Sequence, residues 1–353
     1  MSKTFKKGGV FLFTVLSLPI VRIIFGFLNL PDNIISWLFS FVFQALFMGL
    51  FPFLLYKALV QKDNKLILKE FRVATPLSIS AVLLAIPIGL LVYIQNIGSS
   101  VIWSTLMTLI GFTYSSGVGV IYSSTEVLIL EIITSAVLPA IFEEFIDRGL
   151  LLSVFEDNKN EKFKMFFLGI FFGLLHQNAP QLGPTAVVGV ILVYMAMKCN
   201  SIIPGMIVHF MNNFFITIAD YGTQKGVLFG DIYEAFTNFY LSNWIVLIAV
   251  YAIAWWLLVM LLKYFKRVTE DKTKEPEKLV VVEPERPSIY EIYGYPTPSG
   301  NYVYPRPMPM KEEEFYAPIV EEKPKFFSYS LVWIGWLASL ATTIMTFIWG
   351  FIK

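Results

Sequence analysis

The chain has only two histidines, and both lie inside long apolar runs, at His176 and His209. A third apolar run is interrupted by four charged residues, which are Glu143, Glu144, Asp147 and Arg148. On insertion scales a charge at the centre of a bilayer costs about 2.5–3.5 kcal/mol, so four unpaired charges would cost on the order of 10 kcal/mol. Charges of this kind in an apolar run indicate pairing, function or both.

Helical spacing pairs some of these charges. Glu144 and Arg148 are four residues apart, so they share a helix face and can form an ion pair. Glu143 shares a neighbouring face with Asp147, which carries the same charge. Glu143 is therefore left without a partner on its own helix, and it is the candidate for acid–base chemistry.

The same one-turn spacing places Phe172 beside His176 and Asn213 beside His209. A helix rises 1.5 Å per residue, so depth can be estimated from the predicted cytoplasmic end of each helix. Glu143 lies about 18 Å deep, His176 about 21 Å and His209 about 12 Å. The sequence predicts that these three side chains meet within the membrane and are reached from the cytoplasm.

Two kinds of chemistry fit this set, and both stay open. Glu143, His176 and His209 can hold Zn²⁺ and leave one position for an activated water. Without a metal, Glu143 can act as general base while His209 and Asn213 hold the developing oxyanion. The HExxH pattern of soluble zinc proteases is absent, so this motif supports neither the zinc nor the metal-free chemistry.

The composition of the chain indicates which kind of elements must position these residues. The 353 residues are 56% hydrophobic and only 15% charged, with a mean hydropathy of +0.65. These values exclude a soluble enzyme and indicate an integral, multi-pass protein of the cell membrane whose main partner is the lipid bilayer. The net charge of +1 gives no positive electrostatic field that would attract nucleic acid. The single cysteine, Cys199, allows no internal disulfide.

The apolar runs predict an all-α fold, because lipid cannot satisfy the backbone groups of irregular or edge-exposed chain. We expect eight core transmembrane helices and one C-terminal helix, near 8–30, 33–60, 74–96, 126–155, 162–178, 183–199, 201–220, 240–263 and 328–352. Basic residues gather in five clusters, within residues 3–7, 57–72 and 159–164, at Lys198, and within residues 263–267. These clusters fall on one side of the membrane only if residues 99–122 form an interfacial or re-entrant piece after a connection at 97–100. That side, with the N-terminus, is predicted to be cytoplasmic.

These predicted helices divide the chain into three parts. Residues 1–264 form the membrane domain, and residues 328–353 hold the last helix. Residues 265–327 between them hold ten of the nineteen prolines, ten basic residues and twelve acidic residues, which predicts a disordered cytoplasmic linker. Its Tyr/Pro tracts either tether the last helix or bind a cytoplasmic partner with an aromatic-lined groove.

Three motifs give a resemblance to a known family. Residues 143–148 resemble an EExxxR motif, residues 172–176 an FxxxH motif, and residues 209–213 an HxxxN motif. They occur in this order in the CPBP intramembrane proteases, which include the type II CAAX prenyl endopeptidases and the bacteriocin-processing and immunity proteins. The resemblance covers about residues 126–220. One position departs from it, since residue 147 is often aromatic in the family and is Asp147 here.

The resemblance implies an endopeptidase that cuts a membrane-associated or hydrophobic protein or peptide, including prenylated CAAX substrates. It implies Glu143 as the base, with support from Glu144 and Arg148. The water or a metal would be positioned by His176 and His209, and Asn213 would serve the oxyanion. Two alternatives are a non-proteolytic scaffold or regulator of the immunity type and a proton-coupled transporter, although the inverted repeats of transporters are not evident.

Overall fold

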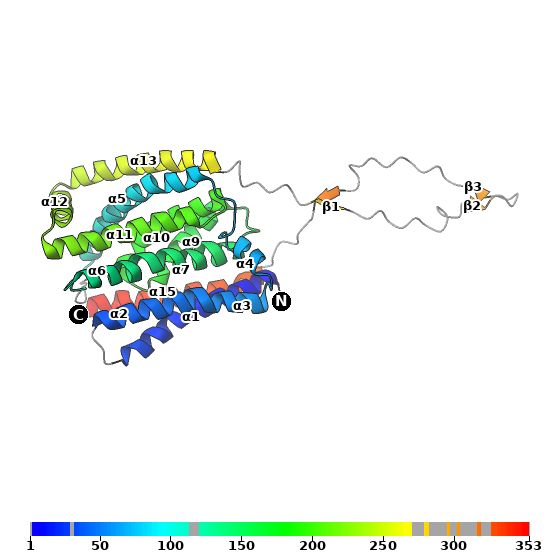
Figure 1. Cartoon of the computed structure of the whole chain (residues 1–353), viewed down its shortest axis with the longest axis horizontal. Coiled ribbons are helices and arrows are strands. Elements are labelled where there is room, and N and C mark those ends of the chain that lie inside the picture. The colour runs from blue at the N-terminus through cyan, green and yellow to red at the C-terminus, as the bar shows by residue number, and fades with distance from the viewer. Residues whose placement is uncertain are drawn as a thin grey trace. The chain divides into compact units, whose positions relative to one another are not determined.

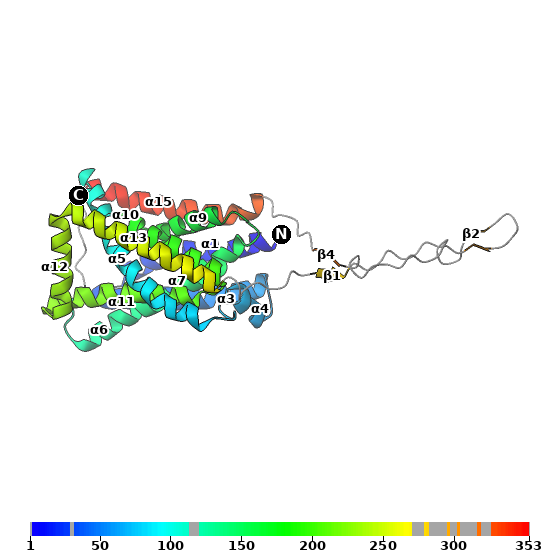
Figure 2. The same cartoon turned by 90° about the horizontal axis from the view of Figure 1, so that it is seen from above.

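The computed structural model of the chain describes residues 2–28, 32–112, 120–269, 279–281, 295–296, 302–303, 316–318 and 326–352, and the statements below concern these residues. The first half consists of α1 (Lys3–Gly26), α2 (Asp32–Phe41), η1 (Val42–Leu50), α3 (Phe51–Leu59), α4 (Asn64–Glu70), α5 (Ile79–Leu109), α6 (Thr125–Ile132), η2 (Ile133–Val137), α7 (Leu138–Glu144), η3 (Phe145–Leu151) and α8 (Leu152–Val154). The second half consists of α9 (Glu161–Leu175), α10 (Ala179–Cys199), α11 (Ile203–Lys225), α12 (Leu228–Ser242), α13 (Trp244–Thr269), the short 3₁₀ segment η6 (Phe326–Tyr329) and α15 (Ser330–Ile352). The long helices form a bundle (Figures 1 and 2).

The prediction of an all-α polytopic membrane protein is confirmed. In the described residues, seven helices are long and apolar enough to cross a membrane. They are Lys3–Gly26, Ile34–Leu59, Ile79–Leu109, Thr125–Val154, Ala179–Cys199, Trp244–Thr269 and Phe327–Phe351. They coincide with seven of the nine predicted spans, and the other two, α9 and α11, carry the histidine motifs and do not meet this standard of length and hydropathy. At 15 residues, α9 spans only about 22 Å of a hydrocarbon core that is about 30 Å thick, and α11 is too polar.

The expected connection at 97–100 is wrong. Helix α5 continues without a break to Leu109, and at 31 residues it is about 46 Å long. The part of the predicted interfacial piece that the structure describes is therefore first an extension of α5, followed by chain without helix up to Thr125. Residues 113–119, within the same prediction, lie outside the described residues.

All five basic clusters gather at one end of the bundle, as predicted. Figure 1 shows the N-terminus and α4 at this end, opposite α12. Side-chain contacts join the clusters: Lys3 pairs with Glu70, and Lys198 bonds Glu161 at 2.9 Å from Nζ to Oε1. The hydroxyl of Thr269 at the end of α13 donates to the carbonyl of Lys198 at 3.2 Å. Helix α5 thus counts as one crossing.

The cluster around Glu70 at this end predicts an acid-sensitive contact. Burial alone would raise the pKa of Glu70, but hydrogen bonds from Lys3 and Tyr56 and the charge of Lys7 outweigh it and lower the pKa below its ordinary value. A carboxyl with a lowered folded pKa stabilises the fold above its unfolded pKa of about 4.3, and this stabilisation is lost as pH falls through the folded value.

We therefore expect the unfolding temperature to fall with acidification below about pH 4, and less steeply in Glu70→Gln. The measurement is tryptophan fluorescence in detergent during heating, at several pH values. The exposed Glu234 gives the control, and Glu234→Gln should keep the wild-type slope. Equal slopes in Glu70→Gln and wild type would contradict the assignment.

Close packing of α9 on α10 depends on glycine. A Cβ atom at Gly173 would lie 2.6 Å from the carbonyl oxygen of Leu182, and one at Gly189 would lie 2.8 Å from the carbonyl oxygen of Gly169. Gly169 and Gly173 are four residues apart on one face of α9, the small-xxx-small spacing that lets membrane helices approach closely. This contact fixes the position of the helix end that carries His176.

Substitution of Gly173 by alanine should destabilise the bundle. The added methyl meets backbone atoms, which cannot rotate away, and overpacking of this kind costs about 1–3 kcal/mol. We expect a lower unfolding temperature for Gly173→Ala in detergent, measured by tryptophan fluorescence. The control is Gly26→Ala, because a Cβ there has no neighbour within 4 Å. The packing argument fails if the two variants unfold at the same temperature.

The end of the chain returns to the membrane domain. Helix α15 packs along α1 and α9, and the backbone N–H of Ala179 donates to the hydroxyl of Thr346 at 3.2 Å. Residues 1–273 and 324–353 form one compact unit, and residues 274–323 form a second. Helix α13 continues to Thr269, so the first five residues of the predicted linker, 265–269, are helical.

The predicted disorder of the linker falls mostly on residues outside the described ones. The described exceptions are two antiparallel strand pairs, in which β1 (Leu279–Val281) pairs with β4 (Tyr316–Pro318) and β2 (Tyr295–Pro296) pairs with β3 (Tyr302–Val303). The predicted disorder of the remaining linker residues stays a prediction.

Candidate active site

The charged motif lies on one long helix that contains two π-helical segments. Residues Thr125–Val154 run as one span, but η2 and η3 within it are π-helical. π-helical segments inside α-helices are frequent at functional sites because they re-aim side chains and free backbone groups. Segment η3 carries Asp147 and Arg148, and η2 carries Ser135.

The predicted pair of Glu144 and Arg148 is present. Arg148 Nη1 lies 2.8 Å from Glu144 Oε1, and both side chains are completely buried. Arg148 Nη2 also donates to the carbonyl of Gly189 on α10 at 3.3 Å, and its guanidinium carbon lies 4.2 Å from the centre of the Phe172 ring. Arg148 therefore holds three helices together and balances the charge of Glu144.

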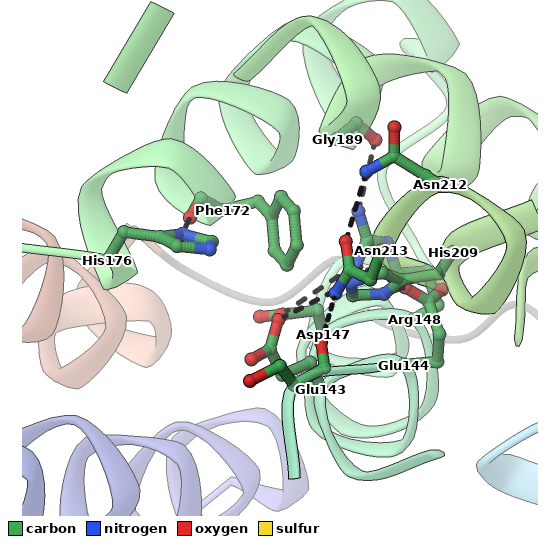
Figure 3. Close-up of polar contacts among 11 residues, drawn as sticks. Glu143, Glu144, Asp147, Arg148, Phe172, His176, Gly189, His209, Asn212 and Asn213 are labelled. Carbon is green, nitrogen blue, oxygen red and sulfur yellow. Dashed lines mark hydrogen bonds and ion pairs between the residues drawn. The ribbon is translucent and has the colours of Figure 1, made fainter. Parts of the chain in front are cut away.

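His209 joins this pair from α11. Its Nδ1 lies 2.9 Å from Glu144 Oε1, and its Nε2 lies 3.8 Å from Glu143 Oε2 (Figure 3). An ionised Glu144 accepts a hydrogen bond, so it fixes the proton of His209 on Nδ1 and leaves Nε2 toward Glu143. Arg148, Glu144 and His209 thus form one continuous polar chain that ends beside Glu143.

His176 takes a separate position. It caps the C-terminal end of α9, and its Nδ1 lies 2.9 Å from the carbonyl oxygen of Phe172. The Phe172 ring makes edge contacts with both imidazoles, at 5.1 Å from His176 and 5.7 Å from His209, so it stands between them (Figure 3). The next residue, Gln177, has a positive φ of 50°, and its side-chain oxygen accepts from Arg22 Nη1 at 3.4 Å.

The structure shows how the three predicted zinc ligands are arranged. Among the residues that the structure describes, no group of three or more His, Cys, Asp or Glu is arranged to hold a metal ion. The Phe172 ring separates His176 from His209. The three predicted ligands are therefore not arranged around one metal position, and zinc binding stays a prediction.

Asn213 is part of a hydrogen-bonded set that the sequence did not reveal. Its Nδ2 donates to the carbonyl of Ser135 at 3.0 Å, and its Oδ1 accepts from Asn212 Nδ2 at 3.0 Å. Asn212 Oδ1 in turn accepts from Asn96 Nδ2 on α5 at 3.0 Å. One signal in the sequence was Pro139, four residues after Ser135, because proline has no N–H for that carbonyl.

Two cavities meet at these residues. One cavity of about 320 Å³ is lined by Glu143, His176, His209 and Asn213, together with Asn96, Asn212 and Ser135. A smaller and more apolar cavity of about 150 Å³ extends toward α1 and η1, with Phe11, Val15, Leu18, Phe39 and Phe43 on its walls. Glu143, Phe172 and His176 line both cavities, so the carboxyl of Glu143 lies where polar and apolar space join.

Three carboxyl groups here are short of partners. Glu143 Oε2, Glu144 Oε2 and both oxygens of Asp147 are buried without a hydrogen bond in the described part of the chain. The nearest cation to Asp147 is Arg148, whose Nη1 lies 3.8 Å from Oδ2. Glu143 is therefore free to bond a water or a substrate group in the cavity.

Comparison with known proteins agrees with these motifs. No curated protein and no solved structure matches the chain. One family model does match, and it covers the helices that carry Glu143, Arg148, His176, His209 and Asn213, though not Asn96. The resemblance seen in the motifs is confirmed, since residues 124–215 are similar to the family described as Type II CAAX prenyl endopeptidase Rce1-like, which supports an intramembrane endopeptidase at the level of the family.

Proposed function

We propose that this protein hydrolyses a peptide bond of a membrane-associated or hydrophobic protein, with Glu143 as the general base. The observation that carries the proposal is the position of Glu143. Its unpartnered Oε2 lies 3.8 Å from His209 Nε2, at the junction of the two cavities. A carboxylate with a free oxygen beside a water-sized polar space can take a proton from water.

In the proposed mechanism, a water in the polar cavity lies between Glu143 and His209. Glu143 takes its proton as the water oxygen attacks the carbonyl carbon of the substrate. The developing oxyanion accepts a hydrogen bond from the amide of Asn213. Glu143 then returns the proton to the leaving nitrogen, and the peptide bond breaks. Glu144 and Arg148 act through His209, because they fix its orientation and its proton.

Substrate class is the next part of the proposal. The apolar cavity beside Glu143 suits a hydrophobic segment, and this supports a substrate with apolar side chains or a prenyl group near the cut bond. We further propose that the N-terminus and the basic end of the bundle face the cytoplasm, by the positive-inside rule. The site would then be reached from that side.

The test compares peptide termini across the membrane proteome of the native host. Three strains carry wild-type protein, Glu143→Gln or His209→Ala at equal levels. We expect termini that are present with wild type and lost in both variants, and these would name the substrate. Identical profiles in all three strains would overturn the proposal and favour a scaffold or a transporter.

The same strains test the metal-free mechanism. We expect cleavage in isolated membranes to survive a zinc chelator. Loss of cleavage that added Zn²⁺ restores would replace this mechanism by zinc chemistry at Glu143, His176 and His209.

A further inference from the structure

Three amide side chains that line the polar cavity form a chain of hydrogen bonds. Asn96 on α5 donates to Asn212 on α11, Asn212 donates to Asn213, and Asn213 donates to the carbonyl of Ser135 on η2. Each of the three bonds is 3.0 Å long. Asn212 is buried, and all four residues line the cavity. Asn96 comes from a helix outside residues 124–215, which the family match covers.

The carbonyl of Ser135 fixes the direction of this chain. This carbonyl lies in the π-helical segment η2, and the N–H that an α-helix would direct to it is missing, because residue 139 is Pro139. A carbonyl can only accept, so Asn213 must turn its NH₂ group toward it. The Oδ1 of Asn213 then requires a donor, which Asn212 supplies, and Oδ1 of Asn212 requires a donor in turn.

Asn96 supplies that last donor. An amide NH₂ group has two N–H bonds. Asn213 uses one for Ser135, so the second is left for a group in the cavity. A chain of hydrogen bonds that all run in one direction also polarises its members and strengthens each bond.

We propose that Asn96 is a positioning residue, which acts through Asn212 to hold the amide of Asn213 with an N–H toward the substrate carbonyl. The inference rests on the proposed function, and it adds a residue from α5 to the machinery. Asn96 itself does not touch the reacting atoms in this assignment.

The substitution Asn96→Asp tests the direction of the chain. It keeps the shape of the side chain but replaces the donor by a carboxylate that accepts. Asn212 would have to turn over to donate to it, and Asn213 would then turn over as well. The Oδ1 of Asn213 would face the carbonyl of Ser135, and two acceptors repel. While the introduced carboxylate is ionised, no arrangement of the three side chains satisfies every group.

The assay uses full-length protein in detergent and a synthetic peptide that spans the bond mapped in host membranes. Loss of one oxyanion donor lowers kcat by about 100-fold to 1,000-fold. We expect Asn96→Asp to lower kcat about 100-fold, with KM within twofold of wild type. Asn96→Ala removes the donor without forcing the others to turn, so it should lower kcat by about tenfold or less.

A double variant separates positioning from general damage. In the Asn213→Ala background the chain has lost its last member, so neither substitution of Asn96 should lower kcat further. Asn96→Ala serves for this comparison if Asn96→Asp does not fold. Effects that multiply in the double variant would overturn the inference, as would equal kcat for Asn96→Asp and Asn96→Ala.

The outcome for Asn96 is distinguishable from that of the proposed function. If Glu143→Gln changes the termini in host membranes while both Asn96 variants cleave like wild type, only the role of Asn96 fails. If Glu143→Gln changes nothing, no bond is mapped and the endopeptidase proposal itself fails.

Discussion

Glu143→Gln should lower turnover by about a thousandfold or more while leaving the unfolding temperature close to that of wild type. The amide has the shape of the carboxyl but cannot take a proton from water, and general-base catalysis contributes about 10²–10⁴-fold. Because Oε2 of Glu143 has no hydrogen-bond partner in the described residues, replacing it by an amide nitrogen breaks no hydrogen bond of the fold at that atom. The rate is measured with purified protein on the mapped peptide, and the fold by tryptophan fluorescence during heating.

The matched control lies on the same span. Glu126 is exposed near the start of α6 and does not line either cavity. Glu126→Gln makes the same chemical change and should keep full activity. Near-normal activity in Glu143→Gln would remove Glu143 as the base.

Arg148→Met should produce the largest loss of stability. The side chain is completely buried, pairs with Glu144 at 2.8 Å and bonds the carbonyl of Gly189 at 3.3 Å. Removal of one partner of a buried pair leaves an uncompensated charge and costs about 3–5 kcal/mol. We expect a large drop in unfolding temperature, together with lost activity, because Glu144 would no longer hold His209 in place.

A double-mutant cycle tests whether the pair is the cause. Glu144→Gln removes the charge that Arg148→Met would leave unpaired, so the double variant should be more stable than the sum of the two single effects predicts. Additive losses would show that Arg148 acts through its contacts with Gly189 and Phe172 instead. The measurement is unfolding in detergent for wild type, both single variants and the double variant.

Much of the site could be predicted because helical spacing is local. Four-residue spacing gave the pair of Glu144 and Arg148, and the depth estimate brought His209 to Glu143. The same estimate placed His176 with them, but depth carries no information on rotation about the helix. The ring of Phe172, on the face that the spacing correctly assigned, lies between the two histidines and separates them.

Contacts between helices that lie far apart in the sequence cannot be predicted from local spacing. Asn96 and Asn212 are 116 residues apart, and nothing in their spacing joins them. The break expected at 97–100 was inferred from the distribution of basic residues, but Gly98 and Ser99 are buried within α5, where both contact Tyr251. Basic residues indicate on which side a loop lies and carry no information on where a helix ends.

The contact of α1 with α15 joins the first and the last helix that the ribosome makes. Gly8 and Gly9 on α1 bring its backbone close to Leu331 and Val332, so one face of the first helix is completed by the last. About 300 residues separate these helices, and a ribosome that adds about 5–20 residues per second needs roughly 15–60 s to translate them. During that time the face of α1 must be held by lipid or an insertion factor. Premature termination within residues 265–327 would release a protein that has every motif of the site but lacks the helix that covers this face of α1.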